Sequence, residues 1–297
     1  MKPLVIGATG MVGGYLYSRL QSRGLDPIGT SSVTESGYRQ LDLRNRDELV
    51  GLIDDVQPSM IFLAAAQTNV EYCEEHPAES RAVNVAPVAA LAEHLRDSDV
   101  PFVFFSSDYV FDGQAGPYRE TDAPNPISEY GRQKFECEQI LLKALPKTAI
   151  IPRITVVYGW EREGKNFVVR LIRNLKNGET ARVPSDQINS PSYAGNVAQA
   201  AIELALQRQS GIFHTSGPEV MDRYAFAQAV CDVYGLDQSL IQPITTPELK
   251  QKAPRPLKAG MIVEKAQALL SFPLLNAHDG LTAMREEDSP WNTSRDG

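Results

Sequence analysis

A tyrosine and a lysine stand four residues apart, Tyr130 and Lys134, in the segment SEYGRQKFECE. On a helix such residues share one face, with their Cβ atoms about 5–6 Å apart. The ordinary pKa of a tyrosine hydroxyl is about 10, and a neighbouring ammonium group stabilises the phenolate and lowers that pKa. Tyr130 could then give a proton to an alkoxide or take one from an alcohol. Tyr-x-x-x-Lys often arises by chance on an ordinary helix surface, so the meaning of this pair depends on the rest of the chain.

Three glycines near the N-terminus, Gly7, Gly10 and Gly13, have the spacing G-x-x-G-x-x-G. They follow a short apolar segment, Leu4–Ile6, that we expect to be a buried strand, and a helix is expected from about Met11. A helix N-terminus offers free N–H groups and a positive dipole end to a pyrophosphate, and glycines let the backbone approach it. The loop predicts dinucleotide binding. The alternative is a tight turn with a close-packed helix.

The residues at the end of the second expected strand, which lies in the segment GLDPIGTSS at 24–32, bear on the choice of dinucleotide. An acid there would bind the adenosine ribose and favour NAD, but the segment GTSS at 29–32 has none. Its small hydroxyl residues leave room for a 2′-phosphate, for which Arg39 is a candidate partner, so NADP(H) is favoured over NAD(H). Asp42 and Leu43 suit a contact with the adenine edge, although Asp42 is also placed to cap the next helix.

Strands and helices alternate through the first half of the chain. The segments 59–66, 100–108 and 148–159 are apolar without alternation, and the segment 77–99 reads as one long helix. Continuous apolar strands predict burial on both faces and hence a parallel sheet. We therefore expect an α/β fold with a doubly wound, Rossmann-type sheet. The cofactor domain is expected in residues 1–160, with segments near 190–215 returning to it, and residues 161–297 mostly form a smaller C-terminal substrate-binding lobe.

This architecture gives the Tyr130–Lys134 pair a context, because the preceding strand ends in SSD at 106–108. The carboxyl end of a strand in such a sheet faces the ligand crevice. Ser107 could orient a substrate carbonyl, or merely satisfy a backbone group. Lys134 could also bind the nicotinamide ribose, and its ammonium together with a cationic nicotinamide would lower the pKa of Tyr130. The predicted cofactor contacts are Gly7, Thr9, Gly10, Met11, Val12, Gly13, Thr30, Ser31, Asp42, Leu43, Ala64, Ala65, Ala66, Tyr130 and Lys134.

The glycine loop, the Ser107 strand end and the Tyr-x-x-x-Lys pair together resemble the extended short-chain dehydrogenase/reductase superfamily. More narrowly, AAAQTNVEYCEEHP, SSDYVFDG, YGWEREGKNFVVRLI, SDQINSPSYAGNVA and APRPLKAG are similar to the dTDP-4-dehydrorhamnose reductase family. The resemblance implies an NADP(H)-dependent reductase of a 4-keto-6-deoxy sugar nucleotide, such as dTDP-4-dehydrorhamnose. It also implies that Ser107, Tyr130 and Lys134 are catalytic, with Tyr130 as the general acid.

The substrate region departs from that family. The family has a Trp three residues after the arginine that Arg153 matches; this chain has Val156 there and Trp160 four residues on, and Ala259 replaces a serine. The identity of the sugar therefore stays open. The predicted substrate contacts, each otherwise an ordinary surface or loop residue, are Asp108, Arg153, Asn166, Gln187 and Arg255, with Arg170 and Arg173 as further candidate donors.

Composition excludes several classes of function. Lys and Arg total 29 against 37 Asp and Glu, and the net charge of -8 favours neither nucleic acid nor a membrane surface as partner. Cys73, Cys137 and Cys231 form no disulfide or metal-type pattern, so we expect reduced thiols, no metal and a cytoplasmic protein. No apolar run is long enough for a signal peptide or a membrane span. The expected partner is a nucleotide sugar, and a homodimer is considered.

Two alternative functions remain. A sugar-nucleotide epimerase or dehydratase could use the same scaffold, but a dehydratase needs further acid and base residues, and SSDYV offers only Asp108. A non-catalytic NADP-binding regulatory subunit, resembling that of methionine adenosyltransferase, is the other. The intact Ser107, Tyr130 and Lys134 argue against lost catalysis, without excluding a regulatory role.

Overall fold

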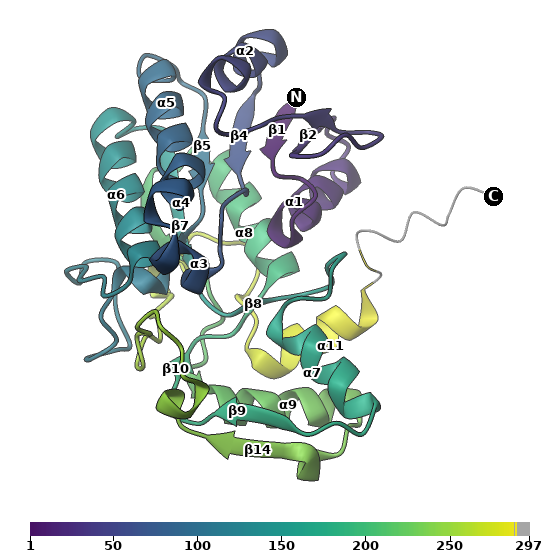
Figure 1. The fold of residues 1–297 in the computed structure, drawn as a ribbon. Helices are drawn as coiled ribbons and strands as arrows, with labels where there is room; N and C mark the ends of the chain where they lie inside the picture. Colours follow the sequence, from purple (N-terminus) through teal and green to yellow (C-terminus); the bar gives the residue numbers. More distant parts are fainter. Residues whose placement is uncertain (288, 290–297) are drawn as a thin grey trace.

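The computed structural model describes residues 1–287 and 289, and it has two lobes (Figure 1). The last residues of the predicted substrate lobe, 288 and 290–297, lie outside the described part. Within the described ranges, no helix combines the length and apolar character needed to cross a bilayer.

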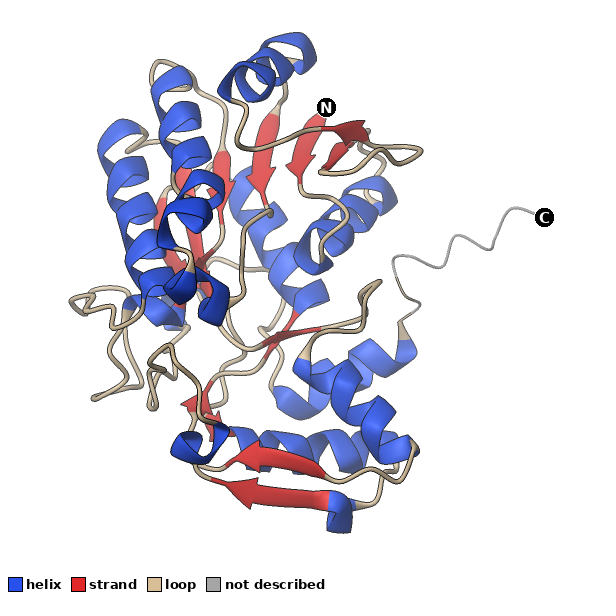
Figure 2. Cartoon of the chain, viewed as in Figure 1, coloured by secondary structure: helices blue, strands red, loops and turns tan. Residues whose placement is uncertain are grey.

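A parallel sheet forms the centre of the first lobe, as predicted (Figure 2). Its order is β12-β7-β5-β4-β1-β2-β3, with β6 paired to β7, and all its strand pairs are parallel. The chain runs outward in opposite directions from β1, so the crevice at the carboxyl ends of β1 and β4 is the expected ligand site. The strands are β1 (Pro3–Ile6), β2 (Ile28–Ser31), β3 (Arg39–Gln40), β4 (Met60–Leu63), β5 (Phe102–Phe104), β6 (Ser106–Ser107), β7 (Ala149–Ile154) and β12 (Gly211–His214).

Both faces of the sheet are buried, which explains the unbroken apolar strands. In β1, Val5 faces one hydrophobic core, whereas Leu4 and Ile6 face the other. The first core lies under α1 and α8, and the second under α2, α5 and α6. These helices are α1 (Met11–Ser22), α2 (Arg46–Val56), α5 (Ala86–His94), α6 (Glu129–Ala144) and α8 (Ala194–Leu206).

The long helix predicted over 77–99 is wrong in one respect, because it is two helices. They are α4 (Pro77–Asn84) and α5, separated at Val85, and the shorter α3 (Val70–Glu75) precedes them. Pro87 lies in the first turn of α5, where a residue without an N–H group is tolerated. A proline in the middle of one continuous helix would instead remove a hydrogen bond.

The segment near 190–215 lies in the first lobe. Helix α8 packs against α1, and β12 extends the sheet by pairing with β7. Just before α8, the short strand β11 (Ser192–Tyr193) pairs with β8 (Val157–Tyr158), which follows β7. The chain therefore leaves the sheet after β7 and comes back to it before entering the second lobe again.

The second lobe is small and mixed, and lies below the sheet in Figure 1. Its parallel pair is β9 (Ala181–Pro184) with β14 (Ile241–Ile244), and α9 (Arg223–Tyr234) lies against both strands. Its other elements are α7 (Phe167–Lys176), β10 (Ile188–Asn189), β13 (Met221–Asp222), α11 (Ala277–Glu286) and the 3-10 turns η2 (Gln238–Leu240) and η3 (Thr246–Leu249). The 3-10 turn η1 (Asp108–Val110) packs on α6, and α10 (Glu264–Gln267) on β12.

A buried histidine in β12 makes the fold sensitive to acid. Burial, aided by the charge of Arg153, lowers the pKa of His214 from its ordinary 6.5 to about 3. Because the unfolded chain binds this proton more readily, the free energy of unfolding falls as pH drops below about 6.5, with a slope approaching about 1.4 kcal/mol per pH unit.

We expect His214→Asn to lose less stability than the parent between pH 6.5 and 4.5, although it is less stable at pH 7 because packing is lost. Urea unfolding at a series of pH values measures this. The control is the same change at exposed His278, which should leave the slope unaltered. Parallel curves for parent and His214→Asn would contradict the assignment.

Candidate active site

A cavity of about 840 Å³ lies at the carboxyl ends of the central strands. The glycine loop, the ends of β2, β4 and β7, and the start of α6 all contribute to its wall. It is therefore built from segments that are distant in sequence. The predicted cofactor residues in its lining are Gly7, Thr9, Gly10, Met11, Val12, Thr30, Asp42, Leu43, Ala64, Ala65, Ala66 and Tyr130.

The three glycines of the loop have different structural roles. Gly7 has φ +85°, and a Cβ there would lie 2.6 Å from the Cβ of Ala65. A Cβ on Gly13 would lie 2.0 Å from the Gly7 oxygen, so Gly13 lets α1 approach β1 and is not part of the cavity lining. Gly10 begins α1 in an ordinary conformation, with φ −79°.

The open end of α1 fits a pyrophosphate. No side chain in the described part of the protein caps this helix, and Gly10 and the first residues of α1 line the cavity. A helix N-terminus without a cap presents N–H groups and a positive dipole end to an anion. The volume of the cavity lies in the usual range for a cofactor site.

Helix capping and a close backbone contact bring Tyr130 to the end of β6. The Ser128 hydroxyl caps α6 by accepting a hydrogen bond from the Gly131 N–H at 3.3 Å. A Cβ on Gly131 would lie 2.2 Å from the Tyr109 carbonyl oxygen, so glycine lets α6 pack directly against η1. Tyr130 and Ser107 then both line the cavity.

Burial decides the protonation state of Tyr130. It raises the pKa of the hydroxyl, the charge of Asp108 raises it further, and a hydrogen bond with Ser107 opposes the rise. The lowering predicted from the sequence concerns the complex with a cationic nicotinamide and stays a prediction; in the protein alone the pKa of Tyr130 is raised. The Lys134 ammonium lies 5.7 Å from the Tyr130 ring centroid. Its stabilisation of the phenolate is smaller than the cost of removing the phenolate from water. Tyr130 carries its proton, as a general acid must.

Lys134 lies beneath the cavity instead of in its lining. Its Nζ donates a hydrogen bond to the Phe105 carbonyl oxygen at 2.8 Å and lies 4.6 Å from the centroid of the Phe104 ring. Burial lowers the pKa of Lys134 to about 8. The Lys134 side chain is thus largely charged at neutral pH, and it loses its proton as the pH rises through about 8.

Asp108 is a buried acceptor in the cavity wall, 1% exposed. Its carboxylate accepts hydrogen bonds from Ser107 Oγ at 3.0 Å, Thr155 Oγ1 at 2.7 Å and Asn189 Nδ2 at 3.1 Å. Burial raises the pKa of Asp108 to about 6. The turn cap here is Ser107, whose Oγ accepts from the Tyr109 N–H at 3.3 Å, so Asp108 itself faces the site.

The end of β2 differs from the prediction by one residue. Thr30 lines the cavity, and its Oγ1 accepts a hydrogen bond from the Gly7 N–H at 3.1 Å. Ser31 points inward, where its hydroxyl accepts from the Val33 N–H, and it lies outside the cavity lining. Ser32, which is exposed, lines the cavity in its place.

An arginine that the sequence interpretation missed lies beside these hydroxyl residues. Arg44 lines the cavity and forms an ion pair with Asp42 at 2.7 Å, which lowers the pKa of Asp42 to about 2. Arg39, the candidate 2′-phosphate partner, pairs instead with Asp55 outside the cavity lining. A signal was present in the segment DLRN, where an arginine follows the adenine-edge candidates by one residue.

Three predicted substrate contacts have internal partners. Asn166 caps α7 and donates to the Gly159 carbonyl at 2.9 Å, and Gln187 donates to Thr246 Oγ1 at 3.1 Å. Arg153 is 1% exposed and belongs to a buried ion pair. All three lie outside the cavity lining, so the structure gives them no path to a ligand in it.

Arg255 is differently placed. Its guanidinium donates to the Tyr109 hydroxyl at 3.3 Å and to Glu71 at 2.7 Å, and lies 5.8 Å from the Tyr109 ring centroid. Tyr109 lines the cavity and meets the Tyr130 ring edge to face, with centroids 5.6 Å apart. Arg255 therefore stands next to the cavity wall.

A second missed arginine joins it. Arg223, the first residue of α9, interacts electrostatically with Tyr109 and Asp108 and with the cations Arg170 and Arg255. Three like charges near one wall suit an anionic ligand. The sequence signal was weak but physical, since a cation in the first turn of a helix opposes the dipole.

The family tryptophan position holds a strained valine. Val156 lines the cavity with φ +43°, a conformation that costs energy for a β-branched residue. Trp160 lies elsewhere, with its Nε1 donating to the Met284 carbonyl oxygen at 2.8 Å. The cavity is thus lined by a small side chain where an indole would otherwise stand.

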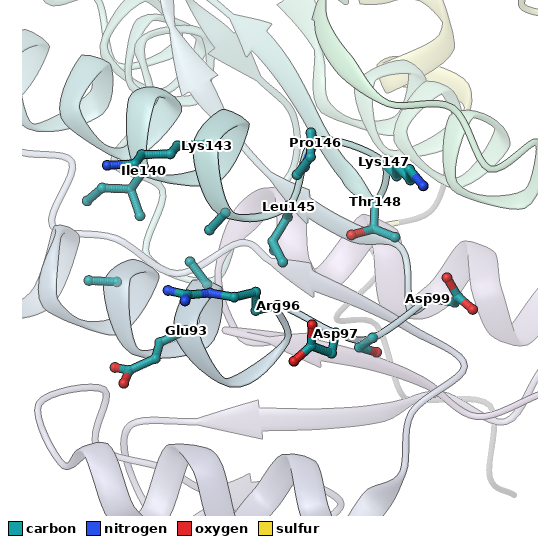
Figure 3. Close-up of a pocket in the computed structure, with 14 residues that line it drawn as sticks. Glu93, Arg96, Asp97, Asp99, Ile140, Lys143, Leu145, Pro146, Lys147 and Thr148 are labelled. Atoms are coloured by element: carbon teal, nitrogen blue, oxygen red, sulfur yellow. The ribbon is translucent and has the colours of Figure 1, made fainter.

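A second hollow, of about 830 Å³, lies between the C-terminal ends of α5 and α6 (Figure 3). Arg96, Lys143 and Thr148 are among its lining residues. It lies at the amino ends of β5 and β7, opposite the edge where doubly wound sheets bind ligands. We do not assign the cofactor to it.

Fold and site together define an extended short-chain dehydrogenase/reductase. Residues 1–289 match the family model described as RmlD substrate binding domain, and the chain belongs to that family. It is similar to a probable low-salt glycan biosynthesis reductase of Haloferax volcanii, with 31% identity covering 99% of this chain and 100% of that protein.

Two further relatives differ in function from each other. The dTDP-4-dehydrorhamnose reductase of Aggregatibacter actinomycetemcomitans is 33% identical, over 89% of this chain and 91% of that protein. The methionine adenosyltransferase 2 subunit beta of Danio rerio is 32% identical, over 90% and 84%. A crystal structure of dTDP-4-dehydrorhamnose reductase from Bacillus anthracis in complex with NADP superposes with a TM-score of 0.88, covering 96% of this chain and 98% of that one at 24% identity.

Proposed function

We propose that this protein is an NADP(H)-dependent reductase of a 4-keto-6-deoxy sugar nucleotide, such as dTDP-4-dehydrorhamnose. The observation that carries the proposal is the convergence of Ser107 and a protonated Tyr130 on the cavity that begins at the glycine loop. Family membership and the reductase relatives support it.

The residues of the chain have distinct roles in this reaction. The backbone from Gly10 onward would hold the pyrophosphate of the cofactor, which would supply the hydride. The Ser107 hydroxyl turns from Asp108 to donate its hydrogen bond to the sugar carbonyl and orient it, and Tyr130 gives its proton to the oxygen of that carbonyl. The charge of Lys134 stabilises the phenolate that remains on Tyr130.

The basic residues near Tyr109 provide the reason for a nucleotide-linked sugar. Arg223 and Arg255, with Arg170 nearby, form a site for the diphosphate of the substrate. Arginine is suited to phosphate because its planar guanidinium can donate two parallel hydrogen bonds. Asp108, with Thr155 and Asn189, is placed to accept hydrogen bonds from sugar hydroxyls.

NADP(H) over NAD(H) is the proposed cofactor preference. Thr30 and Ser32 leave space beside Arg44, which can turn from Asp42 to a 2′-phosphate. We expect Ser32→Asp to shift the ratio of kcat/KM for NADPH and NADH toward NADH by about 10-fold or more, because a carboxylate repels the phosphate.

The control is Ser36→Asp, which adds the same charge at an exposed residue outside the cavity lining. Its cofactor preference should equal that of the parent. A parent that prefers NADH, or an unchanged ratio in Ser32→Asp, would overturn this interpretation of β2.

The alternatives have less support. A dehydratase needs further acid and base residues beside Ser107, and the strand end offers Asp108 alone. The regulatory reading is supported by the similarity to methionine adenosyltransferase 2 subunit beta. It does not by itself account for the intact Ser107, Tyr130 and Lys134.

A homodimer remains a prediction. The cytoplasm remains the proposed compartment because Cys73, Cys137 and Cys231 are free thiols.

Steady-state NADPH oxidation against a panel of 4-keto nucleotide sugars tests the function. We expect turnover with at least one of them, and much weaker turnover with the same keto sugar lacking its nucleoside diphosphate. Absence of turnover across the panel, with NADPH binding intact, would favour the regulatory alternative.

A further inference from the structure

A buried ion pair lies directly behind the catalytic residues. Glu138 and Arg153 are each 1% exposed, and their closest charged atoms are 2.7 Å apart. Arg153 Nε also donates to Glu138 Oε1 at 2.8 Å, so the contact is bidentate. The pair connects α6 with β7, two elements that meet beneath the cavity.

Stability alone is a poor explanation for such a pair. Removing two charges from water costs several kcal/mol per ion, and well-packed apolar residues in the same place are often as stable or more so. The pair is nonetheless fully engaged. Glu138 accepts a further hydrogen bond from Ser106 Oγ at 2.6 Å, and Arg153 lies 4.9 Å from the centroid of the Phe111 ring. A role in placing its neighbours is the better reason for it.

Those neighbours belong to the proposed active site. Ser106, which Glu138 holds, directly precedes Ser107, and β6 pairs with β7 so that Ser106 lies opposite Arg153. The Phe105 carbonyl, on the other side of Ser106, accepts the hydrogen bond of the Lys134 ammonium. One carboxylate therefore fixes the short segment that presents Ser107 and anchors Lys134.

We propose that Glu138 and Arg153 are positioning residues of the reaction. They hold the segment 105–107 against α6, so that Ser107 and the ammonium of Lys134 keep their places beside Tyr130. This inference rests on the proposed function for its effect on turnover.

The surroundings of Lys134 give the proposal an electrostatic signature. The groups that face its ammonium are the thiols of Cys73 on α3 and Cys137 on α6, the Glu138 carboxylate, and the rings of Tyr130 and Phe104. Burial lowers the pKa of Lys134 to about 8, and the two thiols and Glu138 act against this lowering.

Loss of Glu138 and loss of Arg153 should therefore affect the pKa of Lys134 differently. Loss of the Glu138 charge lowers the pKa of Lys134 further. Loss of the Arg153 charge leaves Glu138 unopposed and does not lower it.

Glu138→Gln is the central variant, because glutamine keeps an oxygen for the Ser106 hydroxyl and for Arg153 Nε while it removes the charge and the second acceptor, which receives from Arg153 Nη2. We expect the alkaline limb of its kcat–pH profile to move to lower pH by at least about half a unit. At pH 7 we expect kcat to fall between about 10- and 100-fold, with the Kd for NADPH within about threefold of the parent. Arg153→Met should lose kcat without moving that limb to lower pH.

A purely structural role predicts a different pattern. Both variants would then lose activity in proportion to their loss of Tm, with the alkaline limb unmoved. That result, or an equal downward shift in both, would overturn the proposal. If the single variants fail to fold, Glu138→Met combined with Arg153→Met replaces the pair by apolar residues. The double variant should bind NADPH and still lose kcat; full kcat would overturn the proposal.

A substrate-independent measurement separates this inference from the proposed function. The NMR titration of the Lys134 Nζ group, assigned by its loss in Lys134→Met, reports the pKa directly. Glu138→Gln should lower that pKa relative to the parent, and an unchanged pKa would contradict the inference. If the parent reduces no 4-keto nucleotide sugar, the proposed function fails. The comparison of the Lys134 pKa between the parent and Glu138→Gln still decides the role of Glu138.

Discussion

Tyr130→Phe should lower kcat by about 10²–10⁴-fold, the usual contribution of a positioned general acid. The phenyl ring still fills the space against Tyr109, so the cavity keeps its shape and NADPH binding stays close to that of the parent. What disappears is the proton that burial holds on the hydroxyl. Single-turnover and steady-state NADPH oxidation on the true substrate, with NADPH affinity by fluorescence titration, measure the two effects separately.

A matched control is Tyr158→Phe, which removes a hydroxyl from another buried tyrosine outside the cavity lining. It should keep kcat within about threefold. Ser107→Ala should cost less than Tyr130→Phe, because water can partly replace a carbonyl-orienting hydrogen bond. If Tyr130→Phe retains more than about a tenth of the parent kcat while hydride transfer limits the rate, Tyr130 is not the proton donor.

Gly10→Val should weaken NADPH binding by about 100-fold or more, equivalent to about 2.7 kcal/mol or more. Gly10 lines the cavity at the N-terminus of α1, so the new side chain occupies space that the pyrophosphate needs. The fold can accept it, since φ is −79° and the nearest atom to an added Cβ is the Gly7 oxygen at 3.4 Å. Gly13 would be a poor choice, because its added Cβ would lie 2.0 Å from that same oxygen and disturb α1.

The same substitution at Gly51 provides the control, since a Cβ there would meet no other described atom within 4 Å. Gly51→Val, in the middle of α2, should lose a little stability and keep the parent affinity for NADPH. Fluorescence titration and Tm together distinguish a blocked site from an unfolded protein. Parent-like NADPH affinity in a folded Gly10→Val would show that the dinucleotide binds elsewhere.

The glycine loop and the Tyr130–Lys134 pair could be placed from sequence because their geometry is local. The spacing of Gly7, Gly10 and Gly13 is set by one turn and one helix, and residues four apart on a helix must share a face. The continuous apolar strands likewise follow from burial on both faces, which the alternation of Leu4 and Val5 between two cores makes explicit.

The errors arise where a distant partner decides the outcome. Arg153 was expected to contact substrate, but its partner Glu138 lies on another element and takes up both ends of the guanidinium. In β2 the strand ends one residue earlier than the hydroxyl pattern suggests, and since side chains alternate, Ser31 points inward while Ser32 reaches the cavity.

The protonation state of Tyr130 shows the same limit. The sequence places a cation one helical turn away, which favours the phenolate, but it contains no measure of desolvation. In the folded protein desolvation is the larger effect, and the pKa of Tyr130 rises. The raised pKa agrees with the role of general acid, because the proton is held in place before the reaction.

Hydride transfer to a nucleotide-linked keto sugar is the central claim, and isotope transfer tests it most directly. NADPH carrying deuterium on the transferred position is incubated with the protein and a 4-keto-6-deoxy nucleotide sugar, and the product is examined by mass spectrometry and NMR. With the parent protein, we expect one deuterium per product molecule, bonded to the carbon that carried the keto group. With Tyr130→Phe, we expect no such product over the same time. NADPH binding without deuterium in any nucleotide sugar of the panel would contradict the central claim.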